Sequence, residues 1–205
     1  MTLRSDLALV AGLIDDGSRV LDLGCDTGDL LDYLIRERGC RGTGVEIAPD
    51  AVVAAIRRGV PVIELDIDRQ LDEFASHSYD VVVLSRTIQT ITRPEAVLRE
   101  MGRIGHRLIV SVPNFGWWGH RLRLLRGRMP MSKELPYAWY DTPNLRFTTL
   151  SDLQLLFDTV GLVVERRIPT TIHGDPLRVW DVAANALAGA GLYVLRPHPA
   201  GLSSD

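Results

Sequence analysis

Short apolar runs alternate along the chain with segments in which apolar residues recur at helical spacing. Apolar-rich segments of strand length lie at 19–23, 42–46, 60–65, 79–84, 107–112, 162–168 and 192–195. Helical patterns lie at 3–14, 29–38, 49–58, 94–101, 148–160 and 183–188. This alternation predicts an α/β fold, a doubly wound, mostly parallel seven-stranded sheet with helices on both faces.

The segment 113–147 interrupts the alternation after the fifth strand. It contains Trp117, Trp118 and Trp139, and its residues 116–128 have the pattern of a basic amphipathic helix. We expect a single domain over 1–196 that carries this aromatic insertion. A Pro- and Gly-containing tail at 197–205 is expected to be flexible.

Composition excludes several classes of protein. The 205 residues are 46% hydrophobic, enough for one full core, and the formal charge of −3 gives no indication of nucleic acid or an anionic membrane as a partner. The N-terminus is polar, and no apolar stretch is long enough to cross a bilayer. Cys25 and Cys40 form neither a disulfide framework nor a metal motif. We therefore expect a cytoplasmic protein without a metal.

The first strand leads into a glycine-rich turn, Asp22-Leu23-Gly24-Cys25-Asp26-Thr27-Gly28, and a helix follows. Such a turn holds a nucleotide-like ligand against the helix N-terminus. Glu46 ends the second strand at about the 20-residue interval that separates a glycine turn from a ribose-binding acid. Asp66 and Ser85 follow later strands and share the same sheet edge. The sequence thus predicts a ligand site along that edge.

The residue in the middle of the turn narrows the choice of ligand. A dinucleotide site needs glycine there, whereas Asp26 would repel a pyrophosphate. No Gly-Lys-Ser/Thr follows, which excludes a P-loop. A ligand with positive charge and no phosphate fits better. S-adenosylmethionine, which carries an ammonium, a sulfonium and one carboxylate, has this character.

Asp22, Gly24 and Gly28 resemble the acid-x-Gly-x-Gly-x-Gly motif of the class I S-adenosylmethionine-dependent methyltransferases. The resemblance implies a Rossmann-like fold and a site for S-adenosylmethionine or S-adenosylhomocysteine. Asp26 replaces a glycine of the motif. Its carboxylate either pairs with the ammonium of the ligand or crowds the site and weakens binding.

The same resemblance implies individual roles. Asp22 and the turn backbone face the methionine part, Glu46 binds the ribose hydroxyls, and the pair Asp66 and Ile67 reads the adenine edge. The end of the fourth strand, 84–90, offers no His, Asp or Glu, so the catalytic residues stay unknown. The expected binding residues are Asp22, Gly24, Cys25, Asp26, Gly28, Glu46, Ile47, Asp66, Ile67 and Ser85.

The insertion carries a more specific resemblance. The strings 111–118, 121–130 and 135–144 are similar to the MetW family of methionine biosynthesis proteins, and the resemblance extends over about 19–164. Two residues near the expected site depart from the family pattern. Arg86 stands where glutamine is expected, and Asp26 stands where glycine is expected.

This resemblance implies a protein that assists or regulates a homoserine O-acyltransferase. We add the hypothesis that it senses S-adenosylmethionine, the downstream product of the pathway, and thereby influences that partner. Two alternatives stay open: a methyltransferase that acts on a small molecule, and a binding module whose site Asp26 has inactivated. The insertion is either a lid over the site or a surface for the partner. Candidates for these two roles are Asn114, Trp117, Trp118, Arg121, Trp139, Tyr140, Asp141 and Asn144.

Overall fold

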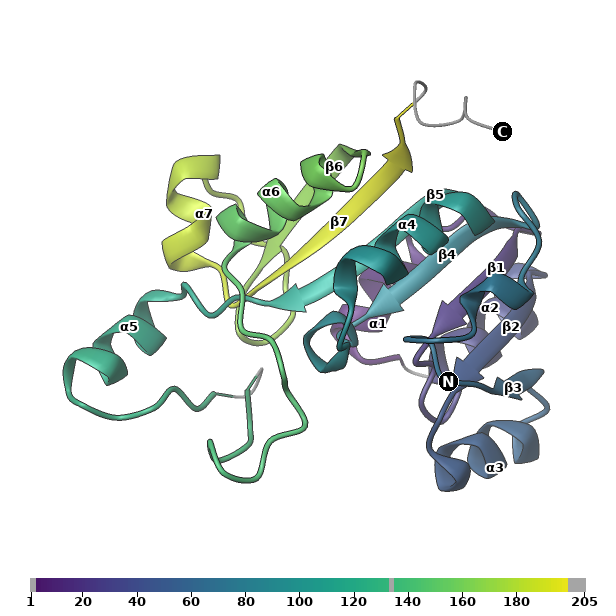
Figure 1. Cartoon of the computed structure of the whole chain (residues 1–205), viewed down its shortest axis with the longest axis horizontal. Coiled ribbons are helices and arrows are strands. Elements are labelled where there is room, and N and C mark those ends of the chain that lie inside the picture. Colours follow the sequence, from purple (N-terminus) through teal and green to yellow (C-terminus); the bar gives the residue numbers. More distant parts are fainter. Residues whose placement is uncertain (1–2, 133–134, 199–205) are drawn as a thin grey trace.

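The computed structural model describes residues 3–132 and 135–198, and in this part seven strands form one sheet in the order β3-β2-β1-β4-β5-β7-β6 (Figure 1). The strands are β1 (Arg19–Leu23), β2 (Arg41–Glu46), β3 (Val62–Glu64), β4 (Tyr79–Ser85), β5 (Gly105–Pro113), β6 (Leu162–Thr170) and β7 (Ala190–Pro197). The helices are α1 (Ser5–Ala11), α2 (Asp29–Arg38), α3 (Pro49–Arg57), α4 (Pro94–Ile104), α5 (Trp118–Leu125), α6 (Leu150–Thr159) and α7 (Asp181–Leu187). Short 3-10 turns occur at Leu71–Glu73 and Ile88–Thr90.

The sheet is parallel from β3 through β5, and β7 runs antiparallel between β5 and β6. The predicted α/β class and the mostly parallel seven-stranded sheet are therefore confirmed. The strand order reverses where β1 pairs with β4, since β2 and β3 lie on one side and the later strands on the other. In open α/β sheets, ligands bind beyond the carboxyl ends of the strands at such a point.

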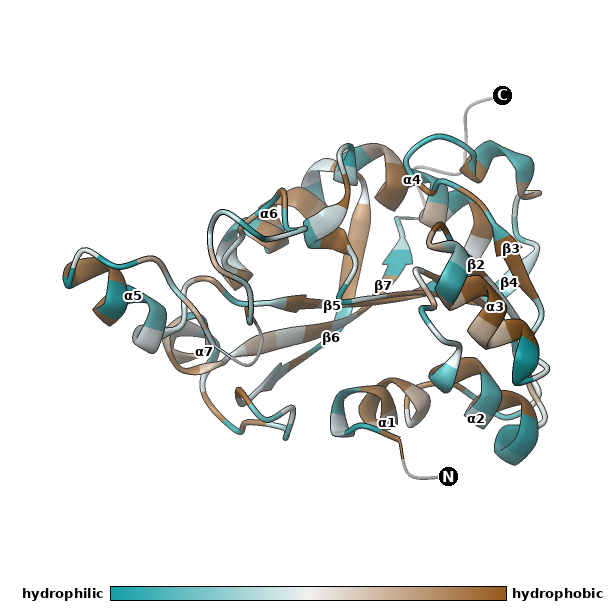
Figure 2. Cartoon of the chain, turned by 90° about the horizontal axis from the view of Figure 1, so that it is seen from below, coloured by the Kyte–Doolittle hydropathy of each residue, from teal (hydrophilic) through white to brown (hydrophobic). Residues whose placement is uncertain are grey.

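The side chains of β4 are buried on both faces of the sheet, and each face is therefore covered by helices. Val82 and Leu84 pack in a core with residues of α4 and α6, while Val81 and Val83 point to the other face, into a core with α1 and α2. Figure 2 shows these helix pairs on opposite sides of the sheet. Each fully buried aliphatic side chain of this kind contributes about 1.5–3 kcal/mol.

Several boundaries differ from the sequence prediction. The basic helix is shorter than 116–128, because Gly127 takes a left-handed φ of 69° just beyond α5. The predicted start of the tail at residue 197 is too early, because Pro197 still pairs with Leu162 at the end of β7. Residues 199–205 of that predicted tail lie outside the described residues.

The connection between β5 and α6 leaves the sheet. Figure 1 shows α5 and the following loop projecting beyond the end of β5, on the same side as α7. Among the described residues, no helix combines the length and apolar character needed to cross a membrane.

Candidate functional site

A cleft of about 770 Å³ lies at the carboxyl ends of β1, β2, β3 and β4. All the binding residues expected from the sequence line it, with the exception of Gly28. Gly28 instead precedes α2 at a left-handed φ of 78° and positions the helix start. The lining residues that the sequence did not predict include Arg4 and Leu7 of the N-terminal segment and Tyr137 of the aromatic loop.

Backbone conformation explains the residue types in the glycine turn. Gly24 has a φ of 74°, and a Cβ atom there would come within 2.6 Å of the Thr87 hydroxyl, so only glycine fits. Asp26 also lies in the left-handed region, at a φ of 49°. Aspartate tolerates this region better than most residues with a side chain. The Asp26 side chain is exposed and lines the cleft.

The Glu46 carboxylate is turned back toward the glycine turn. Its Oε2 accepts a hydrogen bond from the backbone N–H of Asp26 at 2.9 Å. Its Oε1 accepts two more, from the N–H groups of Ile47 at 2.8 Å and Ala48 at 3.0 Å. Glu46 thus joins the end of β2 to the turn after β1 and fixes the shape of this part of the cleft.

Asp22 lies at the base of the cleft and is only 3% exposed. Its Oδ1 atom has no hydrogen-bond partner in the described part of the chain. Burial raises the pKa of Asp22 to about 7, and the negative charge of Glu46 adds to this effect. Buried polar atoms normally have partners. A cationic ligand group placed against Asp22 would supply the missing one.

Cys25 is not a reactive group in this structure. Burial, together with the charges of Asp22, Glu46 and Asp26, raises the pKa of its thiol to about 12. The thiol is therefore neutral near pH 7, whereas the thiolate is the nucleophile. Its sulfur packs against Gly44, where a Cβ atom would lie only 2.5 Å away. The contact of Cys25 with the cleft is thus one of packing.

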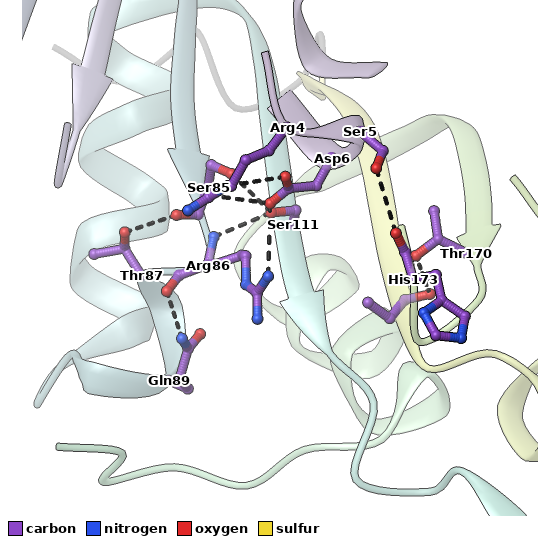
Figure 3. A network of polar contacts seen from close by, with 11 residues as sticks. Arg4, Ser5, Asp6, Ser85, Arg86, Thr87, Gln89, Ser111, Thr170 and His173 are labelled. Carbon is purple, nitrogen blue, oxygen red and sulfur yellow. Dashed lines mark hydrogen bonds and ion pairs between the residues drawn. The ribbon is translucent and has the colours of Figure 1, made fainter. Parts of the chain in front are cut away.

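The end of β4 is tied to its neighbours by polar contacts (Figure 3). The hydroxyl of Ser85, which lines the cleft, lies 3.1 Å from the hydroxyl of Ser111 on β5. Arg86 has a φ of 54°, and its backbone N–H donates to the Ser111 hydroxyl at 3.0 Å. Its guanidinium lies 3.6 Å from the Asp6 carboxylate, which connects this edge of the cleft to α1. The sequence pattern gave no signal for this pairing, because the residues are 80 positions apart in unrelated elements.

Asn114 does not belong to a lid or partner surface, contrary to the expectation from the sequence. It is completely buried. Its amide nitrogen donates to the carbonyl oxygens of Asn185 and Ala188, at 2.9 and 2.8 Å, and its Oδ1 accepts from the N–H of Gly116. Asn114 therefore anchors the start of the insertion to α7, and its polar atoms face protein.

The other candidates of the insertion lie at or near the surface. Trp118, Trp139 and Tyr140 are each more than half exposed, and Asp141 is exposed as well. The remaining candidates make local contacts: Trp117 packs on the Trp118 ring, the Arg121 guanidinium donates to the Gly116 carbonyl, and Asn144 lines an apolar groove beside Phe115 and Phe147.

His120 and Asp141 are titratable residues of the insertion, and neither of them lines the cleft. His120 is buried among aromatic rings, with Phe115 at 5.9 Å and Trp117 at 5.1 Å between centroids. Burial lowers the pKa of His120, so its imidazole is neutral at pH 7. Neither residue is placed to act as a base on a ligand in the cleft.

The strand order, the cleft at its reversal and the glycine turn define a class I methyltransferase fold. A S-adenosylmethionine-dependent methyltransferase from Thermotoga maritima superposes with a TM-score of 0.67 at 20% identity, over 94% of this chain and 87% of that one. One from Archaeoglobus fulgidus gives a TM-score of 0.63 at 17% identity, over 92% of this chain and 93% of that one. At these identities the likeness shows the fold.

Sequence comparison then identifies the family. The family described as methionine biosynthesis protein MetW matches residues 4–195, and the chain belongs to it. The Rhodopirellula baltica bifunctional methionine biosynthesis protein MetXA/MetW is 34% identical over 82% of this chain, which spans 29% of that relative's length. The Aeromonas salmonicida ubiquinone biosynthesis O-methyltransferase is 28% identical over 78% of this chain and 68% of its own length. The family resemblance expected from the insertion is thus confirmed.

Proposed function

We propose that this protein assists a homoserine O-acyltransferase in methionine biosynthesis and binds S-adenosylmethionine in the cleft at the end of β1. The observation that carries the partner role is the Rhodopirellula relative, whose name joins MetXA to MetW in one chain. We take MetXA to be the acyltransferase partner. The fusion of the two in one chain supports the proposal that they act together as separate chains here.

The residues of the cleft fit the proposed ligand. Asp22 presents a buried acceptor without a partner, which suits a cationic group. Glu46 is the acid proposed to face the ribose, and Asp66 with Ile67 the pair proposed for the adenine edge. The cleft volume of about 770 Å³ lies within the usual range of small-molecule sites. When bound, S-adenosylmethionine supplies an activated methyl group, but its role in the proposed function is that of a regulator.

The insertion connects this cleft to the proposed partner surface. Tyr137 and Pro143 border the cleft, while Trp139 and Tyr140 of the same loop are exposed. Exposed aromatic residues of this kind commonly anchor protein interfaces. A ligand that contacts Tyr137 therefore biases the position of the loop that presents Trp139. The binding energy of the pathway's product then changes the affinity for the partner.

Co-expression of this protein with the homoserine O-acyltransferase, followed by pull-down and an acylation assay with and without S-adenosylmethionine, tests the proposal. We expect the two proteins to copurify and acylation to depend on this chain. Trp139→Ala, which changes a side chain of the aromatic loop that is 70% exposed, should weaken copurification. Leu155→Ala on α6, where the leucine is 65% exposed, is the matched control and should not. Absence of copurification, or equal loss in both variants, would refute the proposed partner surface.

The second candidate is methyl transfer to a small molecule, which the match to the Aeromonas O-methyltransferase favours. Incubation with methyl-labelled S-adenosylmethionine and a small-molecule extract tests it. Label in a new product supports an enzyme. Label that stays in S-adenosylmethionine, with acylation dependent on the protein, supports the accessory role.

A further inference from the structure

We propose that Asp26 makes the cleft selective for the positively charged sulfonium of S-adenosylmethionine over the neutral thioether of S-adenosylhomocysteine. The inference rests on the ligand proposed above and assigns a specific role to the residue that replaces the middle glycine of the turn.

The cleft is rich in carboxylates. Those contributed by the described residues are Asp22, Asp26, Asp29, Glu46, Asp66 and Asp68. Ion pairs with arginines engage Asp29 and Asp66. Backbone N–H groups engage Asp68 and Glu46. These four carboxylates are therefore balanced by groups of the protein itself.

Asp22 and Asp26 are different. In the part of the chain that the structure describes, neither side chain has a hydrogen bond or an ion pair. Asp22 is buried at the base of the cleft, and Asp26 is exposed at its wall. The arginines of the cleft wall, Arg4 and Arg86, both lie against Asp6. The cleft thus presents two carboxylates without a partner to a ligand that carries two positive charges.

Contacts within the turn indicate which carboxylate faces which charge. The backbone N–H of Asp26 is bound to the Glu46 carboxylate at 2.9 Å, so Asp26 lies next to the acid proposed for the ribose. In S-adenosylmethionine the sulfonium is attached to the ribose by a single methylene, whereas the ammonium lies three carbons farther out. The sulfonium therefore falls beside Asp26, which leaves the ammonium for Asp22. S-adenosylhomocysteine retains the ammonium and has no sulfonium charge.

The size of the effect follows from Coulomb's law. Two unit charges about 5 Å apart interact with an energy that corresponds to about fourfold in affinity in bulk water and over a hundredfold at a protein surface of lower effective dielectric constant. Asp26 is exposed, so we expect a value near the lower end, about tenfold.

Calorimetry with S-adenosylmethionine, S-adenosylhomocysteine and sinefungin tests the assignment. In sinefungin, a carbon bearing an amine replaces the sulfur and restores the positive charge. The wild-type protein should bind S-adenosylmethionine and sinefungin about tenfold more tightly than S-adenosylhomocysteine. Asp26→Asn keeps the shape of the side chain and its tolerance of the left-handed backbone. This variant should lose that preference while its affinity for S-adenosylhomocysteine changes by less than about threefold.

Other outcomes overturn the proposal. Equal affinity of the wild-type protein for all three ligands would show that Asp26 does not sense the sulfonium. Equal weakening of all three in Asp26→Asn would show that Asp26 faces the ammonium. Absence of binding by the wild-type protein and by Asp26→Gly would refute the ligand as well as the selectivity. The copurification assay gives an independent result for the partner role. Failure of the selectivity proposal can therefore be distinguished from failure of the proposed function. Circular dichroism of each variant verifies that it is folded.

Discussion

Replacing Asp22 with asparagine keeps the size of the side chain and removes its charge. It therefore isolates the electrostatic cost of burying this carboxylate. In the unfolded chain Asp22 has its ordinary pKa of 3.8, and burial raises the pKa to about 7 in the folded protein. The folded state thus binds a proton that the unfolded state has already released between these two pH values.

The sign and size of the effect follow from this difference. Below pH 3.8 the carboxyl group is protonated in both states and has no effect on stability. As the pH rises from there, the free energy of unfolding falls, and the fall is complete once the pH passes about 7. At about 1.4 kcal/mol per pKa unit, the total loss is about 4 kcal/mol.

Urea unfolding of the wild-type protein and Asp22→Asn between pH 4.5 and 8.5 measures this loss. The stability of the variant relative to the wild type should increase by about 3 kcal/mol across this range, because only the wild type must bury a charge. Glu37→Gln, a change at an exposed carboxylate of α2, is the control and should stay within about 0.5 kcal/mol of the wild type at every pH. A difference between Asp22→Asn and wild type that does not vary with pH would contradict the reasoning.

Three further substitutions test the packing and the electrostatics around the site, two by chemical denaturation and one by NMR titration. Asn114→Ala should lower the free energy of unfolding by about 2–4 kcal/mol, because it leaves buried backbone groups without partners. The control Asn144→Ala, at a half-buried position, should lower it by under about 1 kcal/mol. Similar losses in the two variants would show that Asn114 is no anchor. Gly24→Ala should destabilise by about 2 kcal/mol or more, because of its positive φ and the clash with Thr87, and an unchanged midpoint would contradict this turn geometry. Glu46→Gln should lower the pKa of Asp22, since it removes the second cause of the shift, and an unchanged titration of Asp22 in carbon-detected NMR would show that Glu46 has no such effect.

The sheet and the general location of the site could be predicted from the sequence for local reasons. The centre of β4 is the unbroken apolar run 81–84, which is typical of a strand buried on both faces, and the turn after β1 carries the glycines that its backbone requires. Parallel strands then bring the ends of β2 and β3 to the same edge without any knowledge of long-range contacts.

The remaining features depend on contacts between distant segments. The antiparallel position of β7 arises from pairing with both β5 and β6, and its apolar pattern alone does not reveal direction. Asn114 looked like a residue of an exposed loop, because nothing in the local sequence shows that α7 packs over it. The ion pair between Asp6 and Arg86 likewise joins two elements that no local pattern connects.

The hydrogen bonds that the Glu46 carboxylate already accepts limit what it can add to the affinity for a ligand. Its Oε1 already accepts two backbone N–H groups and its Oε2 accepts one, so a ribose hydroxyl would largely exchange with existing hydrogen bonds and add few new ones. Such an exchange contributes little net free energy. Affinity would then depend mainly on the charges of Asp22 and Asp26. Because mobile ions screen exposed charges over about 8–10 Å at physiological ionic strength, raising the salt concentration should weaken binding through Asp26 far more than through the buried Asp22.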